Sequence, residues 1–214
     1  AKRDLQVMLL AMTCSAGGKH AFLRAWRAFY TWAEEEELID RNPMRGMRLK
    51  VPKPLRYAVK LEDVSILLKA CETLRDQLVI SLLADTGLRQ SELAGVRTQD
   101  LIQETQTITV WGKGSKQRIV RYGPHTETLL RRYLRNREST DTLLGFTPRG
   151  IAMMLYRLGK ATGIKCNAHA FRRTFACESV RNGLNLFYIQ SLLGHSTLTM
   201  TRIYAEQVGS EEDD

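Results

Sequence analysis

Apolar residues near the start of the chain recur at the spacing of a helix. Phe22, Trp26, Phe29, Tyr30 and Ala33 follow one another at intervals of three, four and seven residues, so they share one helical face. Such an aromatic stripe is typical of a core rather than of a ligand site, and we expect these side chains to be buried. Arginines fall on the remaining faces of this helix, where they meet either solvent or a phosphate backbone.

Proline and basic residues interrupt this pattern near residue 50. The "RNP" at 41–43 ends the helix, because the residue before a proline is pushed out of helical geometry. The prolines and basic side chains that follow show no periodicity, which predicts a basic linker over residues 51–59. We therefore expect a helical unit at 1–50 and a larger domain at 60–204.

The larger region contains helical patterns and two short strand patterns. Thr147 followed by Pro148 is a helix start signal, and Gly87 predicts a break between two helices. Helices are predicted at 61–74, 75–86, 88–96, 125–137, 147–163, 168–181, 186–193 and 197–204, and strands at 107–111 and 118–122. The sequence thus predicts a mainly α fold with a small antiparallel β-sheet, and a disordered acidic tail at 205–214.

The formal net charge of +9 is unevenly distributed over the 214 residues. The last ten residues carry five acids and no base, so the rest of the chain stands at +14. A surplus of this size favours a polyanion such as nucleic acid as a partner. A basic protein that is merely soluble is the alternative.

Other features narrow the class of protein. No apolar run of about 18 residues and no signal peptide is present, which predicts an intracellular, cytoplasmic protein. Cys14, Cys71, Cys166 and Cys177 lack zinc-site spacing, so we expect reduced, partly buried thiols. The turn "GKGSK" lacks the spacing of a phosphate-binding loop. We expect neither a metal nor a nucleotide cofactor.

Two local clusters carry groups suited to cutting a DNA strand without a metal. The anionic transition state of that reaction needs fixed cations, and the planar fork of arginine holds two phosphate oxygens. In "TGLRQSEL", Arg89 and Glu92 lie one helical turn apart, although alone they would be an ordinary surface ion pair. In "HAFRRTFA", His169 and Arg172 share a helix face, which alone would be a solvated face.

A third cluster lies near the end of the chain. "LLGHS" places His195 after a glycine at a predicted helix C-terminus, and Tyr204 follows nine residues later in "TRIY". A tyrosine at such a place is ordinarily a core aromatic. The alternative is a nucleophile, because neighbouring cations or a base assist a phenol whose pKa is otherwise near 10.

Together with a lysine in "GKGSKQRIV", these motifs resemble the tyrosine recombinases, the phage integrase and Xer-like family, in order and approximate spacing. The resemblance covers about Leu61 to Tyr204, and five motifs in order make it specific. It implies a tyrosine-recombinase catalytic domain. The segment "FLRAWRAFYTWAEEEELIDRNP" resembles the later part of the family's all-helical core-binding domain, which is partial here because residues 1–50 give about half its length.

The resemblance implies a role for each matching residue. Tyr204 matches the nucleophile that forms a 3′-phosphotyrosyl link and releases a 5′-hydroxyl. Arg89 and Arg172 match the arginines that clamp the phosphate, and Glu92 matches the acidic position that organises the site. His169 matches the histidine that hydrogen-bonds the phosphate and helps to deprotonate the tyrosine.

The remaining matches involve a lysine and a second histidine. Lys113 matches the hairpin lysine that protonates the leaving 5′-oxygen, with Lys116 as the less favoured assignment. His195 matches the histidine that supports a non-bridging oxygen. Further basic residues are candidates for DNA contact outside the chemistry: Arg24, Arg27, Lys50, Lys53, Arg56, Lys116, Arg118 and Arg173.

The implied function is site-specific recombination of double-stranded DNA. The resemblance implies a homotetramer on two paired sites, formed from a monomer or dimer, and leaves room for accessory DNA-bending proteins. Neither ATP nor a metal is implied, because one phosphodiester is exchanged for another. A type IB topoisomerase and a non-catalytic DNA-binding protein on the same fold stay open as alternatives. Ten residues after Tyr204 are few beside the C-terminal segments that many relatives dock into a neighbouring subunit.

Overall fold

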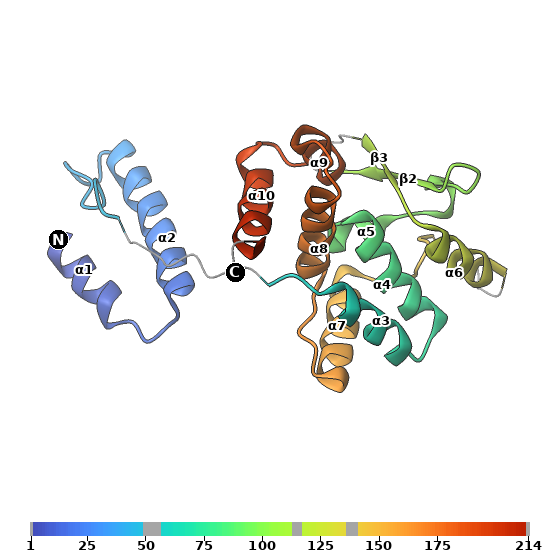
Figure 1. The fold of residues 1–214 in the computed structure, drawn as a ribbon. Coiled ribbons are helices and arrows are strands. Elements are labelled where there is room, and N and C mark those ends of the chain that lie inside the picture. Colours follow the sequence, from blue (N-terminus) through green and yellow to red (C-terminus); the bar gives the residue numbers. More distant parts are fainter. Residues whose placement is uncertain (1, 49–56, 113–116, 136–140, 213–214) are drawn as a thin grey trace. The chain divides into compact units, whose positions relative to one another are not determined.

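The computed structural model describes residues 2–48, 57–112, 117–135 and 141–212 (Figure 1). The chain divides into two compact units, Ala1–Leu55 and Arg56–Asp214, and each is described by itself.

Over residues 2–48, the smaller unit contains two helices, α1 (Lys2–Ala11) and α2 (Ala16–Glu35). Ser15 caps α2, since its Oγ accepts a hydrogen bond from the backbone N–H of Gly18 at 3.2 Å. The buried cluster of this unit is small and consists of Leu5, Leu9, Leu23, Met44 and Met47.

The aromatic stripe of α2 is only partly buried, so the expectation of burial was wrong for two of its members. Trp26 and Tyr30 pack against the small cluster, and Ala33 is buried. Phe22 and Phe29, in contrast, are 48% and 55% exposed. The physical reason is the thinness of this unit: the apolar face of α2 is wider than the cluster that covers it.

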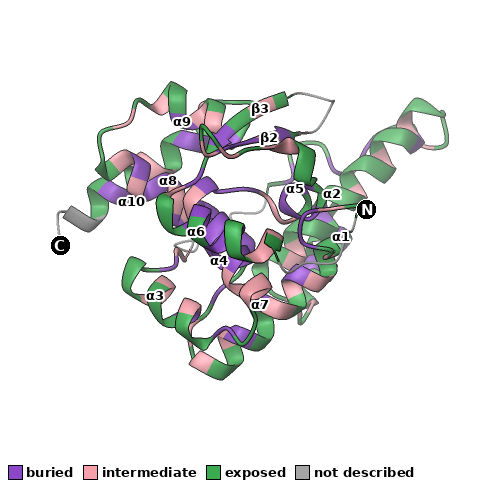
Figure 2. Ribbon diagram, turned by 90° about the vertical axis from the view of Figure 1, so that its right-hand side faces the viewer, coloured by how far each residue is buried: buried purple, intermediate pink, exposed green. Residues whose placement is uncertain are grey.

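The larger unit is built around α4. Figure 2 shows buried residues concentrated on α4 and α8, whose side chains supply much of the main core. The helices of this unit are α3 (Leu61–Ala70), α4 (Leu74–Thr86), α5 (Gln90–Gly95), α6 (Pro124–Arg135), α7 (Pro148–Thr162), α8 (Ala168–Arg181), α9 (Leu186–Leu193) and α10 (Thr199–Glu212), with a 3₁₀ turn at Thr98–Asp100.

A three-stranded antiparallel sheet lies beside these helices. Its strands are β1 (Leu101–Ile102), β2 (Thr107–Trp111) and β3 (Gln117–Arg121), in the order β1-β2-β3. Thr109 pairs with Ile119 at the centre of the hairpin. The predicted fold class, mainly α with a small antiparallel sheet, is confirmed. The two-residue strand β1 was not predicted, because it is too short to show a period of two.

Local sequence signals set several helix ends as expected. Gly87 ends α4 in the left-handed conformation, with φ of 59°. Thr147 caps α7, whose first residue is Pro148, by accepting a hydrogen bond from the Gly150 N–H at 3.0 Å.

The first residues of the larger unit are joined to α8. Val59 is buried in the main core, and the Thr174 hydroxyl donates to its carbonyl oxygen at 2.6 Å. Arg173 donates to the carbonyl oxygen of Tyr57, also at 2.6 Å. Positions 57–59, at the end of the predicted linker, are therefore part of the packed unit. Its earlier positions, 51–56, lie outside the described residues.

The acidic end of the chain is helical, which corrects the expectation of a disordered tail after Tyr204. Helix α10 continues to Glu212 and lies alongside α8 (Figure 1). Val208, one turn after Tyr204, is 5% exposed. Val208 is buried on the same helix face as the partly buried Tyr204. This burial stabilises the helix beyond Tyr204.

Two simpler expectations can be checked on the described residues. None of the four cysteines, all of which lie within the described ranges, forms a disulfide; three are buried and Cys14 is partly exposed. No helix within the described ranges has the length and apolar character to cross a membrane.

Candidate active site

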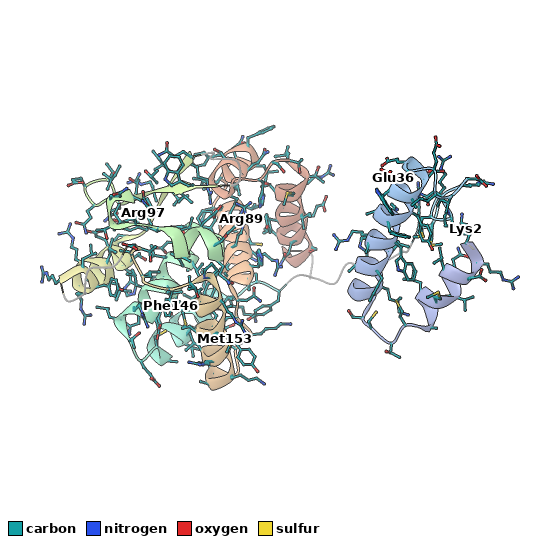
Figure 3. All side chains as sticks on the ribbon, turned by 180° about the vertical axis from the view of Figure 1, so that it is seen from behind. Lys2, Glu36, Arg89, Arg97, Phe146 and Met153 are labelled. Carbon is teal, nitrogen blue, oxygen red and sulfur yellow. The ribbon has the colours of Figure 1, made fainter. Side chains whose placement is uncertain are left out.

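The turn between α4 and α5 places Arg89 at the start of α5. A Cβ at Gly87 would lie 2.7 Å from the ring of Phe175, so this turn tolerates no larger residue. Arg89 directly precedes α5 and its backbone N–H donates to Glu92 Oε2 at 2.8 Å. The same carboxylate thus caps the helix and lies beside the arginine side chain. Figure 3 shows where Arg89 lies in the larger unit.

Two guanidinium groups surround the carboxylate of Glu92, which is 5% exposed as a side chain. Arg89 Nη1 lies 2.7 Å from Oε1, and Arg118 from β3 binds both oxygens, at 3.0 and 2.8 Å. Burial alone would raise the pKa of Glu92. Hydrogen bonds from Arg118 and from the Arg89 backbone outweigh it and lower the pKa to about 2. The pair at 89 and 92 is therefore part of a three-residue ion cluster around a buried carboxylate, in which the Arg89 side chain is 33% exposed.

Arg172 connects the two turns that flank the site. It is 4% exposed, and its guanidinium donates to the carbonyl oxygen of Gly87, at 2.8 Å, and to that of Leu193. Burial, followed by repulsion from Arg89, lowers the pKa of Arg172 to about 10. The group stays positively charged at neutral pH.

The turn after α9 brings His195 to the same place. Gly194 has φ of 63° and its carbonyl oxygen accepts from Arg89 Nη2 at 3.1 Å. A Cβ at Gly194 would lie 3.3 Å from the Arg118 guanidinium. Gln190 holds the backbone of His195 through two hydrogen bonds. The Gln190 carbonyl oxygen accepts from the His195 N–H, and the Gln190 side-chain amide donates to the His195 carbonyl oxygen, each at 3.1 Å.

The ring of His195 is buried and neutral at physiological pH. Burial, reinforced by repulsion from Arg172 and Arg89, lowers its pKa from 6.5 to about 4. Its Nδ1 lies 2.9 Å from the hydroxyl oxygen of Thr201, a residue of α10 with no exposed surface. A neutral imidazole in this position offers a hydrogen-bond donor without adding charge beside the arginines.

Tyr204 lies next to this ring. Its side chain is partly buried, packs against Ala176, Ile189 and Leu193, and stacks on His195 with ring centroids 6.0 Å apart and planes at 23°. The ring therefore makes core contacts and also borders the polar cluster.

A cleft of about 820 Å³ opens over this cluster. Its walls include Arg89, Glu92, Trp111, Arg118, His195 and Met200. The larger unit has another cavity, of about 450 Å³, but it is lined by Phe146 and Met153, which lie well away from Arg89 in Figure 3. An anionic group in this cleft would therefore meet Arg89 and His195 among the site residues.

His169 occupies the first turn of α8, one turn before Arg172, and is exposed. Five of the basic residues singled out in the sequence lie outside the described residues: Lys50, Lys53, Arg56, Lys113 and Lys116.

The candidate DNA-contact residues within the described ranges differ in exposure. Arg24 and Arg27 are exposed on α2, and Arg27 donates to the Met47 carbonyl oxygen at 3.0 Å. Arg118 is only 11% exposed as a side chain, and its guanidinium binds Glu92 and the Leu192 carbonyl oxygen. All three of its guanidinium nitrogens thus donate to protein oxygens, although the residue also lines the cleft.

Sequence reasoning missed two contributors to the site, Thr201 and the Arg118–Glu92 contact. Thr201 lies three residues before Tyr204 and so shares its helix face, which is a signal that could have drawn attention to it. Arg118 and Glu92 are 26 residues apart and on different elements, and no local spacing reveals that pairing.

The arrangement suits a tetrahedral anion. Arg89 and Arg172 supply permanent positive charge, His195 supplies a neutral donor and Tyr204 supplies a hydroxyl. Within the described ranges, no group of three or more His, Cys, Asp or Glu side chains is placed to hold a metal ion.

Comparison with known proteins gives consistent results. The model of the phage integrase family matches residues 58–210. Tyrosine recombinase XerA of Saccharolobus solfataricus is 38% identical over 167 residues, which are 76% of this chain and 57% of that relative. Tyrosine recombinase XerC of Listeria monocytogenes is 33% identical over 202 residues, which are 83% of this chain and 67% of that relative.

Solved structures share the fold. The Tn1549 transposon integrase in complex with a circular intermediate DNA has a TM-score of 0.81 at 21% identity, over 95% of this chain and 80% of that one. The crystal structure of XerA recombinase has a TM-score of 0.65 at 25% identity, over 95% of this chain and 78% of that one.

Proposed function

The chain belongs to the phage integrase family of tyrosine recombinases, and on that premise we propose that it is a site-specific DNA recombinase. It cuts and rejoins DNA strands through a covalent link between a 3′-phosphate and Tyr204. The observation that carries the proposal is the stacking of Tyr204 on His195, in a cluster with Arg89 and Arg172.

The cleavage step follows from these groups. The Tyr204 hydroxyl oxygen attacks the scissile phosphorus, and a new P–O bond forms while the bond to the 5′-oxygen breaks. The phenolic proton passes to a base, a role that the family match gives to His169. A proton from Lys113 goes to the leaving 5′-oxygen, so the products are a 3′-phosphotyrosyl link and a 5′-hydroxyl. Rejoining reverses the same exchange and requires no ATP.

Charge explains why this site would favour the step. The pentacoordinate transition state carries more negative charge than the phosphodiester, so fixed cations stabilise it preferentially. Arg172 is buried and already oriented by two carbonyl oxygens, and Arg89 is oriented by Glu92. Both side chains are thus held in place before a phosphate arrives.

The proposed partner is double-stranded DNA, bound through the basic surface and the cleft. Two observations support it: the charge of +14 outside the last ten residues, and fold relatives that were solved in complex with DNA. We propose further that the active form is a homotetramer on two paired sites, with accessory DNA-bending proteins as additional partners, in the cytoplasm of a prokaryotic or phage-infected cell.

A type IB topoisomerase and a non-catalytic binding protein are less favoured. The curated relatives are named as recombinases. Each position that matches the family's site motifs has the residue type that the matching role requires. Relaxation of a supercoiled plasmid, measured beside recombination between two sites, separates the enzyme classes: a recombinase joins the two sites, whereas a topoisomerase only relaxes the plasmid.

The proposal is tested on a nicked duplex from which the small cleaved strand diffuses away. The site in that duplex is first recovered by selecting protein-bound sequences from a random duplex library. We expect a detergent-resistant protein–DNA band with the wild type and none with Tyr204→Phe. A wild type that binds the selected site without forming the band would contradict the proposal.

A further inference from the structure

We infer that Thr201 fixes the tautomer of His195. Its hydroxyl donates to Nδ1 and leaves the ring proton on Nε2, the nitrogen that would donate to a phosphate oxygen. The catalytic meaning of this inference rests on the proposed function, whereas the tautomer itself is a property of the folded protein.

The two groups meet in a closed environment. The Thr201 hydroxyl oxygen lies 2.9 Å from His195 Nδ1, and the two residues are 0% and 8% exposed. Water therefore has little access to the hydroxyl. The distance is that of an ordinary hydrogen bond.

The hydrogen-bonding groups around Thr201 determine which of the two residues donates in this hydrogen bond. Within the described part of the chain, the Thr201 side chain makes no hydrogen bond except the one to His195. If Nδ1 carried the proton, the hydroxyl would accept it and its own hydrogen would be buried without an acceptor, which is costly. If the hydroxyl donates to an unprotonated Nδ1, both groups are satisfied. The second arrangement is therefore favoured.

Because the His195 ring is neutral, the position of its single proton determines which nitrogen can donate to an anion. The pKa of His195 is lowered to about 4, so a single proton is shared between two ring nitrogens at neutral pH. On Nδ1 that proton would point at Thr201. On Nε2 it is available to an anion beside Arg89 and Arg172, and it adds no charge to be desolvated.

Thr201 also holds the ring against the tyrosine. Thr201 and Tyr204 are three residues apart on α10 and therefore share one face of the helix. One contacts the edge of the imidazole and the other stacks on it. Thr201 is a positioning residue in this account, because it acts on the reaction only through His195.

The direct test is the ¹⁵N spectrum of the imidazole nitrogens at pH 7 in the DNA-free protein. The chain has four histidines, and the His195 signals are those that disappear in His195→Gln. We expect wild-type His195 to be protonated on Nε2 and unprotonated on Nδ1. In Thr201→Val, which keeps the shape but loses the hydroxyl, we expect a mixture of tautomers. Thr201→Ser restores the wild-type pattern.

A matched control separates tautomer from packing. Thr174→Val removes another buried hydroxyl from the same unit, one that binds Val59 and Ala170 carbonyl oxygens rather than His195. We expect it to lower the melting temperature and to leave the His195 tautomer as in the wild type. A wild-type proton on Nδ1, or an unchanged pattern in Thr201→Val, would overturn the inference. If Thr201→Val does not fold, the wild-type spectrum still decides it.

The cleavage assay adds the catalytic readout. Single-turnover formation of the covalent band should be about tenfold slower in Thr201→Val, the effect of about one hydrogen bond, and should recover in Thr201→Ser. Failure of the two proposals is distinguishable. No band in the wild type counts against recombination and leaves the tautomer measurement standing, whereas a normal band with the wrong tautomer counts against Thr201 alone.

Discussion

The α5–β3 side and the α9–α10 side of the site hold their polar groups in different ways. On the first, one buried carboxylate, Glu92, is bound by two guanidinium groups. On the second, a neutral ring is bound by a hydroxyl and a stacked phenol. The first side thus pairs one negative charge with two positive ones, whereas the two site side chains of the second, His195 and Tyr204, are held without a charged partner.

This difference follows from where the arginines lie. Burial lowers the pKa of His195, and Arg172, Arg89 and Arg118 lower it further, while hydrogen bonds from Arg118 and Arg89 stabilise ionised Glu92. If the ring on the α9–α10 side were positively charged, it would repel the arginines before any anion is bound. A neutral donor there completes an anion site without that cost.

The largest effect is expected where the two sides are joined. Arg172 binds the carbonyl oxygens that precede both Arg89 and His195, so Arg172→Ala separates the sides and removes a phosphate donor. We expect single-turnover cleavage of the selected site to fall by about 10³-fold. Arg157→Ala, from the other cavity, is the matched loss of an arginine. Comparable rates in the two variants would contradict the role of Arg172.

A stability measurement examines the charged side alone. Glu92→Ala leaves Arg118, 11% exposed as a side chain, without its carboxylate. Because an unpaired buried charge is costly, the free energy of unfolding in urea should fall by about 3 kcal/mol.

The control for Glu92→Ala is an exposed ion pair on the other side of the site. Arg202 and Glu206 on α10 lie 3.0 Å apart but are 73% and 63% exposed as side chains. Arg202→Ala should change the free energy of unfolding by less than about 0.5 kcal/mol. Equal losses from the two substitutions would show that burial does not distinguish the pairs.

The two sides of the site should also lose stability in different pH ranges, with smaller changes in the free energy of unfolding than those from Glu92→Ala. The folded pKa of His195 is depressed to about 4 from 6.5, so the unfolded chain binds more protons between these values and stability falls as the pH drops through them. For Glu92 the same argument gives a loss between pH 4.5 and about 2. Urea unfolding across pH should show a shallower slope for His195→Gln in the upper window and for Glu92→Gln in the lower one. A wild-type slope in His195→Gln between pH 6.5 and 4.5 would refute the assignment.

The sequence predicted the elements of the site better than the contacts within it. Gly87, Thr147 and the hairpin are read from local rules, and the motifs around Arg89, Arg172 and Tyr204 point to one chemistry. The contact between Arg118 and Glu92 joins two elements, and that between Thr201 and His195 bridges a turn. Such pairings depend on tertiary packing, which periodicity does not encode.

The same limit explains the two corrections outside the site. A stripe on α2 predicts an apolar face but not how much of it a neighbour will cover, so Phe22 and Phe29 are exposed. An acidic composition after Tyr204 predicts solvation, yet burial of Val208 keeps α10 helical. In both cases the packing surface available to the helix, rather than its sequence pattern, decided the outcome.

The central claim, that Tyr204 is the nucleophile, is tested most directly by locating the covalent bond. The wild-type protein–DNA adduct is trimmed with nuclease and digested with trypsin, which cleaves after Arg202. Tyr204 is then found in the peptide 203–214, while Tyr188 is in the separate peptide 182–202. Mass spectrometry should show the phosphonucleotide mass on Tyr204 within 203–214. The mass on Tyr188, or on any residue other than Tyr204, would contradict the account.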